Sequence, residues 1–423
     1  MKRFLIIFLI FMRLLVSAYL PAQEGDSLDW DIDTIFDEPL PASPSEETKA
    51  NAAGTTVKKL IKQRGYNFGV SYGFSTGFAP GWWVTPWDPD WALREYYLDR
   101  GIKMNGGFSI DAQISEVFRV ISTFGFQIPG FGFGLGDFFF DYSFYDTVFF
   151  RGGKYNLSWG ISPNYGFTNL LSRVPKEGYS GDSYIFKIDV PVGIGGIQAL
   201  ALTRADLNGG VIPRISDFGF GGKYNLALRW ADLDMGVYYK NNMPLRSFFS
   251  IKTTIEKTEL YNEWLAVIDL QNSSELSGAV NLGFARDFFG SKLSLGGELF
   301  FNAEGNAYWY RPETSMQKSE ISPFIEGFNM AFNLVYRPWE KGDPRFFIRF
   351  LYAPWQYSAY LVPGFRLKPW PDIELSLAAP MALGSKDGYY YSNSATDVNG
   401  RLLPFSVVFL VSIGGSVQYG HYY

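Results

Sequence analysis

The chain has 423 residues, no cysteine and a formal net charge of −5 at pH 7. The missing cysteine excludes disulfide bonds and thiolate metal sites within this sequence. There is no basic excess of the kind that nucleic-acid binding requires, so we expect no nucleic-acid partner.

Residues 1–22 have the pattern of a secretory signal peptide, with Lys2 and Arg3 before an apolar run and a small-residue exit. Cleavage after Ala18 and cleavage after Ala22 both fit. Residues 23–64 then predict a disordered, acidic periplasmic arm that ends in a basic junction. Alternatively, the acidic and apolar part of this arm docks on a partner or plugs the barrel predicted below.

The stretch 275–302 shows the pattern that dominates the remaining sequence. On both sides of a DFFG turn at 287–290, large apolar residues alternate with small or polar ones, and Phe300 is the one large residue on the polar side. Alternation with a period of two predicts a pair of antiparallel strands. A soluble sandwich hairpin would also alternate, but the small polar face and the segment length favour strands that cross a bilayer.

Alternating segments continue to the end of the chain, and the composition of 18% aromatic residues with 45 glycines suits aromatic girdles and tight strand contacts. The sequence therefore predicts an all-β fold, a transmembrane antiparallel up-and-down β-barrel in residues 65–423. About eighteen strands are expected, with sixteen as an alternative. They lie near 66–74, 102–113, 116–127, 135–143, 146–160, 182–190, 193–203, 217–230, 231–240, 246–255, 258–269, 275–285, 291–302, 325–336, 345–352, 357–367, 371–380 and 404–422.

The lengths of the connections support this topology. Bacterial barrels have short periplasmic turns and long outside loops, with both termini in the periplasm. Every predicted connection longer than about ten residues falls in the outside set. We therefore expect a bacterial outer-membrane protein with both termini periplasmic. The outside set is 75–101, 128–134, 161–181, 204–216, 241–245, 270–274, 303–324, 353–356 and 381–403.

The last strand resembles the C-terminal strand of outer-membrane barrels, which ends in an aromatic residue and is recognised by the barrel-assembly machinery. Val417, Tyr419 and Tyr423 carry the resemblance. It implies the assembly machinery and outer-membrane lipid as partners. The chain's one histidine, His421, lies in the same strand, so the sequence offers no general base with an acidic partner. We expect no enzyme activity, no metal and no cofactor.

A second resemblance lies between Arg151 and Arg173, and a third in GELFFNAEGN at 297–306. Both are similar to strand-and-loop segments of porin-like outer-membrane families, which implies a channel. The phrase GGKYNL occurs at 152 and again at 221, with Lys and Asn predicted to face the lumen both times. The residues that carry the second resemblance are Gly153, Lys154, Trp159, Gly160, Asn169 and Leu170.

Charged residues on the polar side of the strands are the candidates for a pore lining, because lumen charges set the field along a pore. Alternatively, they form ion pairs that only stiffen the barrel. The candidates are Lys154, Lys187, Asp189, Lys223, Arg229, Asp234, Lys252, Glu298, Arg349 and Glu374.

The predicted connection 75–101 contains Trp82, Trp83, Trp87 and Trp91. Their rings would suit a constriction or a ligand-stacking loop. Alternatively, they lie in the outer aromatic girdle or cap the barrel mouth.

Together these features predict an outer-membrane channel for passive diffusion of small hydrophilic solutes. A transporter of hydrophobic compounds resembling fatty-acid channels is one alternative. A structural or adhesive surface barrel is the other, and it would bind through the connections 161–181, 303–324 and 381–403.

Overall fold

The structure is a computed structural model that describes most of the chain from Gly65 onward. The predicted signal peptide and acidic arm lie outside the described residues, and they remain predictions. Within the described ranges, no helix is long and apolar enough to cross a membrane. These ranges are 65–87, 95–128, 132–155, 157, 159–164, 182–205, 214–215, 218–241, 244–268, 270, 276–303, 327–339, 342–392, 394–396 and 401–422.

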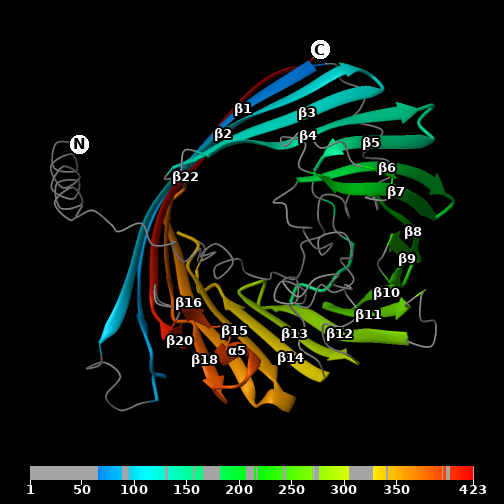
Figure 1. The fold of residues 1–423 in the computed structure, drawn as a ribbon. Coiled ribbons are helices and arrows are strands. Elements are labelled where there is room, and N and C mark those ends of the chain that lie inside the picture. The colour runs from blue at the N-terminus through cyan, green and yellow to red at the C-terminus, as the bar shows by residue number, and fades with distance from the viewer. Residues whose placement is uncertain are drawn as a thin grey trace, which may run out of the picture.

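The described residues form one closed antiparallel barrel of eighteen strands, which confirms the predicted fold class and strand count. Within the described residues, consecutive wall strands pair with each other (Figure 1). The first eleven strands are β1 (Gly65–Trp82), β2 (Tyr96–Ser115), β3 (Phe118–Ile128), β4 (Gly132–Phe144), β5 (Val148–Lys154), β6 (Asp182–Val192), β7 (Gly195–Ala205), β8 (Gly219–Ala227), β9 (Asp232–Lys240), β10 (Leu245–Ile255) and β11 (Thr258–Ile268).

The second part of the barrel contains six more wall strands and several short elements. The wall strands are β12 (Leu276–Phe288), β13 (Leu293–Asn302), β14 (Gly327–Tyr336), β15 (Arg345–Ala353), β16 (Ser358–Trp370) and β17 (Ile373–Ala378). The short elements are η6 (Pro354–Gln356), β18 (Met381–Gly384), α5 (Tyr389–Ser392), β19 (Ala395–Thr396), β20 (Leu402–Leu403) and β21 (Phe405–Ser406).

The long final strand β22 (Val408–Tyr422) closes the barrel. It pairs with β17 on one side and with β1 on the other, where Phe68 lies opposite Tyr419 and Gly65 opposite Tyr422. β18 and β21 extend the lines of β17 and β22 at one end. Closure leaves no free sheet edge, which is the condition for a β-structure to span lipid.

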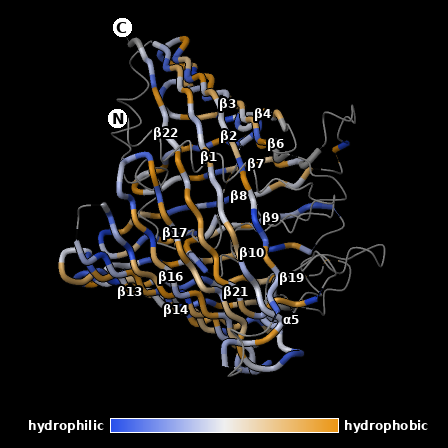
Figure 2. The backbone as a smooth tube through the Cα atoms, turned by 90° about the vertical axis from the view of Figure 1, so that its left-hand side faces the viewer, coloured by the Kyte–Doolittle hydropathy of each residue, from blue (hydrophilic) through white to orange (hydrophobic). Residues whose placement is uncertain are grey.

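Two faces of the wall differ in composition because successive side chains point to opposite sides. The outward rows carry exposed large apolar residues, such as Phe68, Tyr72, Trp264 and Phe301. Hydrophobic and hydrophilic residues consequently interleave along the strands (Figure 2). A monomeric soluble protein rarely exposes so continuous an apolar surface, so the outward face suits a lipid environment.

Two predicted boundaries are wrong. β1 and β2 pair up to Trp82 opposite Tyr96, so the first connection is much shorter than the predicted 75–101. The predicted strand 146–160 ends at Lys154, where the chain leaves the wall. Gly153 makes this exit possible: its φ is +141°, and a Cβ there would lie 2.2 Å from the carbonyl oxygen of Phe138.

We predict that Gly153→Ala destabilises the barrel by about 1–3 kcal/mol, because alanine would force a backbone conformation that only glycine adopts easily. Urea titration of the folded barrel in detergent would measure the change. Gly101→Ala is the matched control, since a Cβ at that strand position meets no atom within 4 Å. Equal stability of the two variants would contradict the assignment of Gly153 as the exit point.

Candidate functional site

After β5 the chain leaves the wall and turns inward, toward the interior of the barrel. This infolded segment comprises Tyr155, Leu157 and 159–164, and it crosses the interior in Figure 1. Trp159 is only 1% exposed and its ring lies 5.6 Å from that of Phe248. The segment packs on inward-facing apolar residues of the wall, among them Ile185, Leu200, Leu202, Tyr238, Phe248, Leu265, Val267, Ala279, Phe300 and Ala331.

This packing explains Phe300, the large residue that interrupts the polar side of the predicted strand 291–302. Phe300 points inward and is fully buried in the same cluster as Trp159. Gly221 also contributes, because a Cβ there would come within 2.8 Å of the Trp159 ring. The inner wall therefore carries an apolar seat shaped for the infolded segment.

Glu298 holds the end of the infolded segment. Its carboxylate accepts hydrogen bonds from the Ser162 hydroxyl at 2.7 Å and from the backbone N–H of Asn164 at 3.0 Å. Tyr261 and Asn281, on neighbouring strands, donate to the same carboxylate at 3.0 and 3.2 Å. Glu298 is 2% exposed, and these donors compensate the cost of burying its charge.

Glu263 provides a second anchor two strands away, on β11. Its Oε1 accepts a hydrogen bond from the backbone N–H of Ile161 at 2.8 Å, and the residue is fully buried. Because Glu263 lies opposite Asn281 in the strand register, both carboxylates belong to one inner patch. Two main-chain N–H groups of the infolded segment, those of Ile161 and Asn164, thus donate hydrogen bonds to wall carboxylates.

The segment is also anchored at Trp159, whose Nε1 donates to Gln198 Oε1 at 2.6 Å. Gln198 in turn donates to Asp189 at 2.8 Å, and Asp189 pairs with Lys187 at 3.1 Å. This chain of contacts connects the infolded segment to the charged part of the wall.

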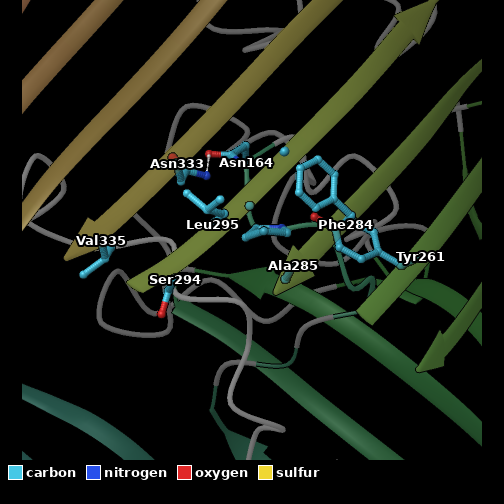
Figure 3. A pocket seen from close by; sticks show the side chains of 11 residues that line it. Asn164, Tyr261, Phe284, Ala285, Ser294, Leu295, Asn333 and Val335 are labelled. Carbon is cyan, nitrogen blue, oxygen red and sulfur yellow. Dashed lines mark hydrogen bonds between the residues drawn. The ribbon is translucent and has the colours of Figure 1, made fainter. Parts of the chain in front are cut away.

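A small pocket lies between the tip of the segment and the wall strands β12–β14 (Figure 3). Asn164 and Asn333 face each other across it, and the Asn333 amide donates to Asn164 at 3.2 Å. Ala285, Ser294 and Gly296 leave room on the wall side. The tip therefore rests on the wall without filling the space beneath it.

Toward the short-turn end, the inner wall carries a series of ion pairs that we call the charge belt. Most of its members pair with a residue on an adjacent strand. Arg119, for example, pairs with Asp111 at 2.6 Å and lies opposite Asp141 in register. The belt comprises Asp111–Arg119, Asp141–Arg151, Lys187–Asp189, Lys223–Asp234, Lys252–Glu259 and Arg366–Glu374–Lys368. Cations and carboxylates nearly balance in it.

One more pair joins Asp343, in the turn before β15, to Arg345, the first residue of that strand. Arg345 donates hydrogen bonds to Asp343, including one at 3.0 Å from its Nε. This contact holds the pKa of the Asp343 carboxyl below its ordinary value.

Eight of the ten predicted pore-lining residues lie in inward-facing rows. Glu298 is the anchor described above. Arg349 lies opposite Asn333 on the inner face. The other six belong to the charge belt, namely Lys187, Asp189, Lys223, Asp234, Lys252 and Glu374.

Two of the ten predicted residues do not lie in inward-facing strand rows. Lys154 lies opposite Phe138 and Tyr184, in the row that contains the outward-facing Phe186, and its ammonium donates to the Leu135 carbonyl. The register therefore places it on the outer face at the point where β5 ends. Arg229 lies in the turn after β8, which ends at Ala227, so strand alternation does not apply to it.

Of the four tryptophans in the predicted connection 75–101, one lies in a strand and two follow the end of that strand. Trp82 ends β1 in an outward row, with its ring 5.9 Å from Tyr96 and 5.2 Å from Phe405. The Trp83 ring lies 4.3 Å from the Arg401 guanidinium, and Trp87 is exposed. Trp91 lies outside the described residues.

The C-terminal strand has the predicted orientation at Val417 and Tyr419, which are both exposed on the outer face. Tyr423 lies outside the described residues, as do Asn169 and Leu170. A role of this strand in assembly stays a prediction.

Strand alternation alone does not predict the infolded segment. The predicted pore-lining residues do not include Glu263 and Asn281, although both have the alternation of inward residues. The available signal was Phe300, since a large apolar side chain on a lumen face needs something to cover it.

No protein-family model and no curated protein matches the sequence. Solved structures are similar in fold. Pseudomonas aeruginosa OccK11 (OpdR) has 6% identity and a TM-score of 0.53, over 85% of this chain and 98% of that chain. OccK9 (OpdG) and OpdQ of the same organism each have 8% identity and a TM-score of 0.52, over 83% of this chain and 98% of theirs. The chain therefore shares their barrel fold.

We predict that Glu298→Ala accelerates amide hydrogen exchange at Asn164 about ten- to hundredfold, because hydrogen bonds to a charged acceptor contribute roughly 1.5–3 kcal/mol. Exchange followed by mass spectrometry of the peptide that covers 159–164 would measure it. Glu374→Ala is the control, since Glu374 pairs with Arg366 and Lys368. Unchanged exchange in Glu298→Ala would contradict the anchoring role.

Proposed function

We propose that this porin-type barrel is an outer-membrane channel for passive diffusion of small hydrophilic solutes. The solved chains named above are Occ/Opd outer-membrane porins, channels for small solutes. The observation that supports the same role for this chain is the inner wall, which carries a belt of charged side chains around a barrel of eighteen strands. Barrels of that size are too wide for side chains alone to fill.

In this proposal the infolded segment narrows the channel. Its apolar side is covered by the seat around Trp159 and Phe300, and its main chain is fixed by Glu263 and Glu298. A segment held by buried charge-assisted hydrogen bonds keeps one position. We propose that this position sets the bore, and that the charge belt contacts the solute beyond it.

The orientation follows the usual arrangement of bacterial barrels, with the short turns and both termini in the periplasm. The role needs no catalytic group and no cofactor. In the described part of the wall, the inward apolar residues are buried in two clusters, one of which surrounds the infolded segment. That arrangement favours a hydrophilic solute over the alternative of a hydrophobic one.

Reconstitution of the folded protein into planar lipid bilayers tests the proposal. We expect discrete conductance steps in potassium chloride. Well-folded protein that inserts without conductance steps would contradict an open channel.

We predict that the wild-type channel discriminates weakly between potassium and chloride, because the charge belt pairs its cations with carboxylates. Asp189→Asn should shift the reversal potential in a salt gradient toward chloride, since it removes the carboxylate that faces Lys187. The shift should shrink at high salt, where charges are screened.

Asp146→Asn is the matched control for Asp189→Asn. Asp146 lies in the turn between β4 and β5, is not a member of the charge belt, and its substitution removes the same charge. Equal shifts in both variants would contradict a lumen role for Asp189.

A further inference from the structure

A second element folds against the inner wall, on the side of β16. The connection after β18 forms the one-turn helix α5, and its Tyr390 ring lies 6.2 Å from the Tyr360 ring at an interplanar angle of 19°. Tyr389 meets Tyr390 edge to face, at 5.4 Å and 86°. We call Tyr360, Tyr389 and Tyr390 the tyrosine shelf.

Strand register places the shelf on the lumen side. Tyr360 lies opposite Leu351 and Ala382, and it packs against the inward-facing cluster that includes Val362 and Phe347. Because Tyr390 stacks on Tyr360, α5 covers the inner face of β16. Tyr389 and Tyr390 are both partly exposed, so their rings retain accessible surface.

The shelf is held in place by its backbone. The N–H groups of Tyr389 and Tyr390 donate to Gln356 at 2.9 Å and to Ser358 at 3.0 Å. Gly384 has a φ of +97°, and a Cβ there would lie 1.9 Å from the Tyr357 carbonyl oxygen. The main-chain N–H groups of α5 are therefore anchored on the side chains of Gln356 and Ser358, next to β16.

A hydrogen-bond donor lies next to the shelf. Arg349 faces the lumen opposite Val362, two residues along β15 from Leu351, the register partner of Tyr360. Its Nε is buried and has no hydrogen-bond partner among the described residues. A buried donor of this kind normally meets a water or a ligand.

We propose that the tyrosine shelf and Arg349 form a stacking subsite for the ring of a neutral carbohydrate. The C–H face of a pyranose packs on aromatic rings, while its hydroxyl groups accept hydrogen bonds from a donor such as the Arg349 guanidinium. This subsite deepens the proposed channel function, on which it rests, by naming a solute class.

Saturation-transfer NMR on the whole barrel, in a detergent without sugar groups, tests the subsite without requiring conductance. The probes are D-glucose and the open-chain polyol sorbitol, which has similar hydroxyl groups but no ring. We expect transfer to the ring protons of glucose and markedly less to sorbitol. Equal transfer to both, or none to glucose, would overturn the proposal.

Substitutions in the tyrosine shelf test which side chains bind glucose. Tyr390→Ala should weaken glucose binding about two- to tenfold, because an aromatic contact contributes roughly 0.5–1.5 kcal/mol. Tyr390→Phe retains the ring and should bind nearly as wild type. Heat-modifiable gel mobility verifies that each variant is folded. Wild-type binding by folded Tyr390→Ala would also overturn the proposal.

Planar-bilayer recordings separate this inference from the channel function. Conductance steps without glucose transfer in the NMR experiment would contradict the subsite and leave the channel function supported. Glucose transfer in a protein without conductance steps would support the subsite and remove the channel.

Discussion

The whole structure depends on the satisfaction of backbone hydrogen bonds in a closed sheet. A strand in lipid has no water to pair with, so each N–H and C=O must find a neighbouring strand. Here consecutive strands pair throughout, and β22 completes the ring by pairing with both β17 and β1. Once the ring is closed, strand alternation decides which side chains meet lipid and which meet the lumen.

The infolded segment must also satisfy its backbone hydrogen bonds, but it does so with side chains of the wall. After Lys154 its main chain has no adjacent strand, so its N–H groups need acceptors within the barrel. Glu263 and Glu298 supply them for Ile161 and Asn164. The wall carboxylates therefore stabilise a piece of chain that the sheet cannot hold, and the apolar seat under Trp159 adds buried surface to the same contact.

Much of the fold could be predicted from the sequence because alternation is a local property. The eighteen strands and the inward rows of the charge belt follow from it. The infolded segment could not be predicted, since its position depends on contacts between residues distant in sequence.

The phrase GGKYNL illustrates the difference. At 221 it stays in β8, with Lys223 inward against Asp234. At 152 the φ of Gly153 turns the chain inward, so Tyr155 and Leu157 are buried inside the barrel. The tyrosine shelf was missed for a similar reason, because α5 reaches β16 through a long connection.

The most direct test of a channel narrowed by an anchored segment is its size limit for neutral polymers. Polyethylene glycols of increasing size reduce the conductance of a pore only while they can enter it. The double variant Glu263→Ala/Glu298→Ala should admit larger polymers than the wild-type channel, because the segment loses both carboxylate anchors. An identical size limit in the wild-type and doubly substituted channels would contradict the account.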